Sequence, residues 1–373
     1  MIYWIWLQSV LRFANGRVSA ILDRFANAEN IYRADTDELV SSGLFTEPEI
    51  KRAQNKSLSV FEKYIKYCKE NGIRIITHDS QLFPDCLINI PDSPLVLYCK
   101  GDLPDFNTVP SVCIVGPRKC SQFGVKAAYS LSARLARGGF VIVSGGAKGV
   151  DAAAHTGALS EGRPTVALLA CGFGYDYLKE NENLREDIMH CGCLITEFPP
   201  QYPVVKGAFR IRNRLMSALS LGTVVIEAGE HSGAIITAKY AVEQNKDVFV
   251  IPGNPADPQY AGSNLLLRDG AKPLLDTSDI FNEYICRYPD KIDIEKAYKP
   301  VPKPEKVKNN TKILNVSLSN QAKIVYNCLD KQKFYPDDLN AGLSPSDLLS
   351  ALTELEMEFI VRALPGGQYE ICK

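Results

Sequence analysis

Short apolar runs alternate with helix-length segments through the middle of the chain. Runs of four or five mainly apolar residues predict β-strands at 73–77, 95–98, 112–115, 140–143, 165–169, 193–196, 223–226 and 247–251. Segments with helical periodicity occur between many of them, at 124–137, 151–160, 184–190, 213–221 and 234–244. This alternation predicts an α/β fold with an extended Rossmann-like, doubly wound and mostly parallel sheet. Ligands of such sheets bind beyond the carboxyl ends of the strands.

The first 70 residues predict a small helical domain. Trp4, Leu7 and Leu11 recur at helical spacing, and later short helices end at breaks such as Gly43. A domain of the SAM or helix-hairpin-helix kind, which would hold DNA backbones, is compatible with this pattern, and so is a packing or partner-binding domain. The apolar start has no basic stretch before it and no small-residue cleavage site after it, which indicates a core helix rather than a signal peptide.

The end of the chain predicts a linker and a second small domain. Lysine and proline are frequent in 298–312, a composition typical of an extended linker. Beyond it we expect helices at 320–329 and 344–358, then a strand pair at 359–362 and 368–371 with a turn at 364–367. This order is winged-helix-like, a class that contains both DNA-binding and protein-binding modules. We therefore divide the chain into a helical domain (1–70), a Rossmann-like domain (71–290), a linker (291–314) and a winged-helix-like domain (315–373).

Composition narrows the function classes without selecting one. With 46% hydrophobic and 23% charged residues the chain is ordinary for a globular protein, and its net charge of -1 requires any nucleic-acid surface to be a local patch. No apolar run reaches the roughly 18 residues of a membrane span, so we expect no membrane partner. The 11 cysteines include no CxxC pair, which argues against a zinc site and favours reduced, buried thiols in a cytoplasmic protein.

Two strand ends that contain glycine predict an anion site. The strand at 112–115 ends at Gly116, with Arg118 just beyond it. Glycine lets a phosphate approach the backbone, and arginine offers a forked donor. The strand at 140–143 is followed by a glycine-rich turn that opens a helix, and this turn contains Ser144, Gly145, Gly146, Lys148 and Gly149. The free amides of that helix would face the anion.

The glycine-rich turn does not match the common cofactor motifs. It is neither a P-loop nor a G-x-G-x-x-G turn, and no acidic ribose ligand follows it, so we expect no nucleotide cofactor. Asp151 is interpreted as a cap or a favourable charge at the start of the helix, and His155 as a structural residue.

A dense positive cluster precedes the helix expected at 213–221. It holds four cations and one aromatic ring in nine residues, namely Lys206, Phe209, Arg210, Arg212 and Arg214. Cations bind phosphates and an aromatic ring stacks on a base, so the cluster indicates single-stranded DNA. The prolines before it indicate an exposed loop. The alternatives are a solvated turn, or arginines that pair with Glu197 or Glu227, and we expect Arg212 to point inward and Lys206 outward.

Further strand ends extend the predicted site. The strand at 223–226 leads to Glu227, after which Ser232 and Gly233 open the next helix. The strand at 247–251 leads to Gly253, and Lys272 follows downstream. Four or five such ends would form one groove along the top of the sheet. Because a mononucleotide needs only one or two strand ends, the pattern favours a strand of several nucleotides.

In this order, the motifs resemble those of the DprA/Smf family of DNA-processing proteins. The similarity runs from Gly116 to Lys272 and covers a glycine-x-arginine strand end, an SG-x-A-x-G-[IV]-D turn, an F-x-x-RNR cluster, an EA…SG…TA segment and a PG…G-x-N tail. The departures are Pro117 for a small hydroxyl residue, Gly146 for an aliphatic residue, Tyr177-Leu178 for a Tyr-Pro pair, and Phe359 for a small residue before the last strand. We expect the first three to change loop shape rather than binding mode.

The resemblance implies a cytoplasmic homodimer that binds and protects incoming single-stranded DNA and loads the RecA recombinase during natural transformation and recombination. The family's DNA-contacting motif falls on Gly116, Arg118, Ser144, Gly145, Lys206, Phe209, Arg212, Asn213 and Arg214. The residue patterns add Gly146, Lys148 and Lys272 to this predicted DNA-binding set.

Two other function classes stay open. A nucleotide-processing enzyme of the lysine-decarboxylase-like phosphoribohydrolase type shares such a sheet, but its PGG-x-GT-x-x-E pattern is absent at 227–234. No Ser-His-Asp set, acid/base carboxylate pair or metal-ligand cluster is recognised either, so we expect no enzyme, no cofactor and no metal. The second alternative is a surface chiefly for other proteins, with incidental DNA contact.

Overall fold

The computed structural model describes residues 1–175, 181–299, 319–329, 333–339, 342–357, 360–364 and 368–371. The chain divides into two compact units, Met1–Lys299 and Pro300–Lys373, which are described separately. Four expected features lie outside the described residues: the Tyr177-Leu178 pair, the linker from 300 to 314, Phe359 and the turn residues 365–367.

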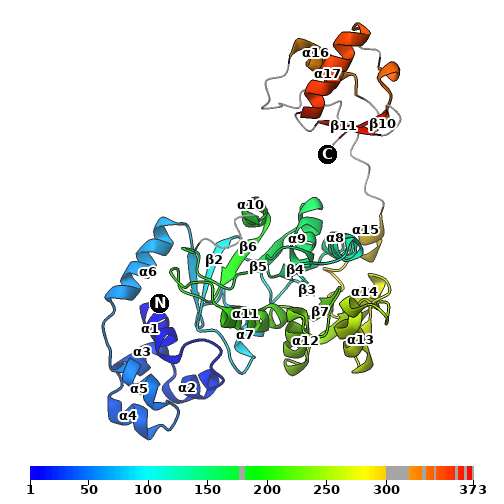
Figure 1. The fold of residues 1–373 in the computed structure, drawn as a ribbon. Helices are drawn as coiled ribbons and strands as arrows, with labels where there is room; N and C mark the ends of the chain where they lie inside the picture. The colour runs from blue at the N-terminus through cyan, green and yellow to red at the C-terminus, as the bar shows by residue number, and fades with distance from the viewer. Residues whose placement is uncertain are drawn as a thin grey trace. The chain divides into compact units, whose positions relative to one another are not determined.

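Six short helices form the first part of the larger unit (Figure 1). They are α1 (Ile2–Leu11), α2 (Val18–Phe25), α3 (Ala28–Arg33), α4 (Thr36–Ser41), α5 (Glu47–Ala53) and α6 (Ser59–Glu70). α1 is apolar on all sides, and seven of its side chains are buried among the other helices. Side-chain caps at Asn27 and Asp35 start α3 and α4. These helices share an apolar core with Val96 and Tyr98 of the sheet, which joins them to the rest of the unit.

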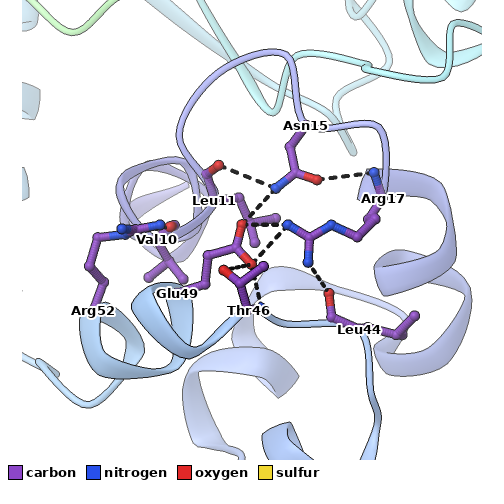
Figure 2. A network of polar contacts seen from close by, with 8 residues as sticks. All are labelled: Val10, Leu11, Asn15, Arg17, Leu44, Thr46, Glu49 and Arg52. Atoms are coloured by element: carbon purple, nitrogen blue, oxygen red, sulfur yellow. Dashed lines mark hydrogen bonds and ion pairs between the residues drawn. The ribbon is translucent and has the colours of Figure 1, made fainter.

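A buried carboxylate fixes the turn between α1 and α2 (Figure 2). Glu49, only 4% exposed, accepts hydrogen bonds from Arg17 at 2.7 Å and from Asn15 at 2.9 Å. It also accepts bonds from the amide and hydroxyl of Thr46, at 2.7 and 2.8 Å, and the bond from the amide is part of the capping box of α5. Burial raises the pKa of Glu49, but the bonds from Thr46 and Arg17 outweigh burial and hold this pKa below its ordinary value.

Replacing Glu49 by glutamine is expected to lower the free energy of unfolding by about 2 kcal/mol at neutral pH, because the charge-assisted bonds are lost. The pKa of Glu49 is depressed in the folded state, so its contribution is present above the ordinary carboxyl pKa and is lost as pH falls through the folded value. The difference in the free energy of unfolding between wild type and variant, measured by urea unfolding, should therefore shrink as pH falls below the ordinary carboxyl value of 4.5. Glu47→Gln, at an exposed position of the same helix, is the control, and an equal loss there would contradict this role.

A nine-stranded, mostly parallel sheet forms the centre of the larger unit, with strand order β1-β2-β6-β5-β4-β3-β7-β8-β9. The strands are β1 (Arg74–Thr77), β2 (Val96–Gly101), β3 (Ser111–Val115), β4 (Val141–Ser144), β5 (Thr165–Leu168), β6 (Cys193–Thr196), β7 (Gly222–Val225), β8 (Asp247–Val250) and β9 (Lys272–Pro273). β1 and β2 are antiparallel at one edge, and β3 to β9 run parallel. The expected α/β fold class is confirmed. The strand order reverses between β3 and β7, the place where doubly wound sheets bind ligands.

Helices cover both faces of this sheet (Figure 1). α8 (Gln122–Arg137), α9 (Val150–Ser160) and α10 (Glu182–Cys191) lie on one face. α7 (Asp85–Ile88), α11 (Lys206–Ala218) and α12 (Gly233–Glu243) lie on the other. Every residue of β3 and β4 is consequently buried, which explains why these strands appear in the sequence as continuous apolar runs.

The larger unit extends past the expected start of the linker at residue 291. After the 3₁₀ turn Pro258–Tyr260 come α13 (Ala261–Arg268), α14 (Ser278–Tyr284) and α15 (Ile294–Tyr298). α15 contacts α8, and its Ala297 is fully buried beside Phe281 in the core. Lys296 is the one lysine of α15, and the Lys- and Pro-rich stretch that begins at its end gave this segment the composition of a linker, although Ile294 and Ala297 pack it into the core.

The described residues of the smaller unit form two α-helices and a three-stranded antiparallel sheet of order β10-β12-β11. Its elements are α16 (Asn320–Asn327), β10 (Lys333–Phe334), the 3₁₀ turn Pro336–Asp338, α17 (Pro345–Met357), β11 (Val361–Leu364) and β12 (Gln368–Ile371). Phe334, Leu352 and Leu355 are buried in its own apolar core. Helices followed by a strand pair agree with the expected order of elements, and assignment to the winged-helix class stays a prediction.

Five of the ten cysteines in the described part of the chain are buried. Within the described ranges, no helix is both long and apolar enough to cross a bilayer.

Candidate nucleic-acid interface

The carboxyl ends of the parallel strands meet at one edge of the sheet, which we call the carboxyl edge. Its main loops are 116–121 after β3, 145–149 after β4, 197–205 after β6 and 226–232 after β7. Each loop leads into a helix, so the first amides of α8, α9, α11 and α12 face this edge. Helix amino termini carry partial positive charge, so the carboxyl edge is suited to anions.

Two of these loops approach each other so closely that only glycine is accommodated between them. A methyl group on Gly149 would lie 2.5 Å from the carbonyl oxygen of Pro117 and 2.6 Å from that of Arg118. Gly149 also has a φ of 80°, which disfavours other residues. A methyl group on Gly116 would in turn lie 2.5 Å from the side chain of Val150. The loop that carries Arg118 is therefore held against the glycine-rich turn.

A buried polar cluster of Asp151, His155 and Arg212 packs against the inner side of the glycine-rich turn after β4. Arg212 is 6% exposed and donates a 3.0 Å hydrogen bond to the carbonyl of the last residue of β5. A methyl group on Gly145 would collide with its guanidinium. Burial raises the pKa of Asp151, and Arg212 opposes this effect. Burial, together with Arg212, lowers the pKa of His155 to about 3, so its ring is neutral and its Nδ1 lies 2.7 Å from Thr165 Oγ1.

The other residues predicted in the turn divide into supporting and exposed ones. The hydroxyl of Ser144 is buried and donates to the carbonyl of Ile114 at 2.7 Å, which links β4 to β3. Gly146 has a φ of 66°, and Lys148 is exposed. Gly149, rather than Asp151, is the N-cap of α9. Asp151 lies within the first helical turn and accepts a long bond from the amide of Ala147 at 3.3 Å.

The positive cluster lies on a helix, which corrects the expected exposed loop. α11 begins at Lys206, so that Lys206 and Arg210 are exposed one helical turn apart. Phe209 is half-buried and packs in an apolar cluster with Phe198. The guanidinium of Arg118 lies 5.0 Å from the centroid of the Phe209 ring, a cation–π contact. The ring expected to receive a base is thus covered by Arg118 on one face.

Arg214 is a structural residue, which corrects its expected contact with DNA. Its side chain is fully buried, with Nη2 2.7 Å from Glu197 Oε2 and Nε 3.2 Å from Asp92 Oδ2. Burial raises the pKa of Glu197 to about 7, although Arg214 opposes the shift. The alternative in which an arginine of the cluster pairs with Glu197 is therefore the arrangement found. The neighbouring Asn213 is 9% exposed.

A hollow of about 350 Å³ opens between these elements at the carboxyl edge. Its lining includes Gly116, Pro117, Arg118, Ala147, Phe209, Asn213, Ser232 and Gly233. Ser232 caps α12 by accepting a bond from the amide of Ala234 at 3.3 Å. The hollow thus combines an arginine and a helix start with a half-buried ring. These groups can bind phosphates and contact an apolar group at the same place.

Lys272 lies away from this site. Its Nζ is 2.8 Å from Asp247 Oδ1 and 2.7 Å from Glu283 Oε2. Asp247 is the first residue of β8, so Lys272 is bound to carboxylates at the opposite end of that strand, which corrects its expected role in DNA binding. The predicted set also omits two exposed cations, Lys119 and Arg210, although each is adjacent in sequence to a selected residue. Lys119 lies in the loop before α8, and Arg210 lies on the exposed side of α11, so their exposure could be recognised only once the starts of these helices were known.

Glu227 begins the segment that was compared with the glutamate-containing pattern of the phosphoribohydrolases, and it has a structural role here. Glu227, which follows β7, is fully buried and accepts bonds from the amide and hydroxyl of Ser121 and from the hydroxyl of Tyr260. Among the described residues, no group of His, Cys, Asp and Glu side chains is arranged to hold a metal ion.

Comparison with known proteins places this edge in a DNA-processing family. The sequence pattern of DNA recombination-mediator protein A matches residues 74–285. DNA processing protein DprA of Bacillus subtilis is 36% identical over 215 residues, which are 58% of this chain and 72% of that protein. The X-ray structure of DNA processing protein A from Streptococcus pneumoniae has a TM-score of 0.67 at 29% identity, over 76% of this chain and 98% of its own.

A second solved structure has the same core. DNA processing protein A from Helicobacter pylori, described with its single-stranded DNA binding mode, has a TM-score of 0.53 at 30% identity, over 58% of this chain and 97% of its own. The residues matched by the family pattern run from β1 through β9 and contain the whole carboxyl edge. The chain therefore belongs to the DNA recombination-mediator protein A family, the DprA/Smf proteins.

Proposed function

We propose that this recombination mediator binds single-stranded DNA along its carboxyl edge, and that as a cytoplasmic homodimer it protects incoming DNA and loads RecA onto it. The observation that carries the proposal is the hollow between the loop after β3, α11 and the start of α12. Exposed Lys206 and Arg210 lie on α11, and Lys119 and Lys148 lie in the loops after β3 and β4. The relative from Helicobacter pylori, described for its single-stranded DNA binding mode, supports the same ligand here.

The proposed binding mode is electrostatic with a local apolar contact. Arg118 and the cations of α11 would neutralise phosphates, while the first amides of α9 and α12 would receive further phosphate oxygens. Gly116, Gly145, Gly146 and Asn213 would shape the surface, and Ser144 and Arg212 would support it from inside. Asp151, His155 and Glu227 are all engaged within the protein, which supports a binding role rather than catalysis.

The domain roles are part of the proposal. The Rossmann-like domain (71–290) would bind DNA, and the winged-helix-like domain (315–373) would act as a tethered module. The helical domain (1–70) packs directly on the sheet, which supports a role in positioning the larger unit rather than as an independent reader of DNA.

Purified protein is expected to bind labelled oligo-dT much more tightly than a matched duplex in fluorescence anisotropy, with a steep dependence on salt, because phosphate contacts release counterions. A RecA ATPase assay on DNA coated with single-strand-binding protein would then test loading. Absence of single-strand binding at low salt would refute the proposal, and nucleoside monophosphate hydrolysis would then test the enzyme alternative.

A further inference from the structure

An exposed phenyl ring stands at the carboxyl edge outside the predicted DNA-binding set. Phe123 lies in the first turn of α8, directly after the loop that follows β3, and 54% of it is exposed. Arg118 and Lys119, both exposed, lie on that same loop. The sequence thus puts an exposed aromatic side chain shortly after two exposed cations, and its π-face is open to a planar partner.

Buried contacts hold the backbone on both sides of this ring. The amide of Ser121 donates to Glu227 Oε2 at 3.0 Å, and its hydroxyl donates to Oε1 of the same carboxylate. The Ser121 oxygen also accepts the amide of Gly124 at 2.9 Å, and Tyr260 donates to Glu227 at 3.0 Å. A methyl group on Gly124 would lie 2.6 Å from the Glu227 carboxyl, so the turn is closely packed. The ring therefore projects from a rigid base, which lowers the entropic cost of binding a planar partner.

The aromatic residue of the α11 cluster is less available for stacking. Phe209 packs in an apolar cluster that includes Ala170 and Phe198, and the guanidinium of Arg118 lies over its ring at 5.0 Å. A base would have to displace that guanidinium to stack on the covered face. Phe123 faces no such competitor from an aromatic or cationic contact among the described residues.

We propose that Phe123 is a nucleobase-binding residue that stacks on one base of the bound single strand while the loop after β3 holds the neighbouring phosphates. This inference rests on the proposed function, because it needs single-stranded DNA at the carboxyl edge. Stacking on a phenyl ring tolerates any base, since every base has a π-face. The contact adds affinity without adding a phosphate contact.

The test compares two oligonucleotides of equal length and phosphate number, oligo-dT and a fully abasic strand, in fluorescence anisotropy. Phe123→Leu is expected to weaken oligo-dT binding about 10-fold, the loss typical of one stacked base, and to leave abasic binding and the salt slope unchanged. Phe123→Trp should keep or improve affinity for oligo-dT. The matched control is Tyr129→Leu, which changes a 41% exposed ring further along α8 and should leave both affinities unchanged.

Equal oligo-dT affinity for Phe123→Leu and wild type would overturn the inference while leaving single-strand binding intact. A similar loss on the abasic strand would overturn it too, because a stacked base could not be the cause, and thermal melting of the variant would show whether misfolding is responsible. Wild-type protein that binds neither strand would instead refute the proposed function together with this inference.

Discussion

Replacing Arg118, Lys206 and Arg210 together by alanine is expected to weaken oligo-dT binding by about 100-fold near 0.1 M salt, at roughly 1 kcal/mol for each lost phosphate contact. All three side chains are exposed at the carboxyl edge. The loss should be accompanied by a flatter salt dependence, with a slope smaller by about 2 for three phosphates of a single strand. Anisotropy titrations over a salt series measure both quantities.

The control for this triple variant removes the same charge elsewhere. Arg287, Lys291 and Lys296 are exposed near the opposite end of the sheet, where Lys291 approaches the turn before β4. Their replacement by alanine changes the net charge equally and should alter oligo-dT affinity only a few-fold, through the long-range field. Similar losses in both triple variants would mean that net charge, and not the carboxyl edge, governs binding.

Arg214→Met is expected to destabilise the fold by about 3–5 kcal/mol, because it leaves the buried Glu197 carboxylate without its main cationic partner. Arg210→Met on the same helix removes an equal charge from an exposed position and should change stability by less than about 0.5 kcal/mol while weakening DNA binding. Urea unfolding and anisotropy on the two variants separate the structural arginine from the proposed phosphate ligand.

The loss of folding stability caused by Arg214→Met should depend on pH. The pKa of Glu197 is raised to about 7 in the folded protein, so its stabilising contribution is present below the ordinary carboxyl pKa and is lost as pH rises toward 7. Loss of Arg214 raises the pKa of Glu197 further. The free energy of unfolding of the variant should therefore keep falling as pH rises above about 7, whereas that of wild type should level off there. A deficit that narrows at alkaline pH, or a Glu197→Gln/Arg214→Met double variant no more stable than the single one, would contradict the pairing.

Most of the fold could be predicted because buried parallel strands appear as unbroken apolar runs. The run at 193–196 coincides with β6, and 112–115 differs from β3 by one residue. β9, at the outer edge, was missed because two residues show no periodicity. α15 falls inside the expected linker because a helix of five residues is too short to show a helical period, and the Lys- and Pro-rich stretch begins at its last residue.

The site could be located from the sequence more easily than its side chains could be oriented. The helical period of α11 is hidden because Arg212 and Arg214 occupy buried positions that normally hold apolar residues. Their partners, Asp151, Glu197 and Asp92, come from distant segments that only the fold brings together. Spacing alone therefore identifies a positive cluster, and tertiary contacts decide which of its cations reach solvent.

The close contact between the glycine-rich turn and the loop after β3 has a consequence for protein engineering. Because Gly149 touches the carbonyls of Pro117 and Arg118, and Gly116 touches Val150, neither loop can be exchanged without the other. A chimera that takes its binding loops from a relative should therefore transplant 116–121 and 145–150 together. Exchange of one loop alone would combine mismatched surfaces and reduce the yield of folded protein.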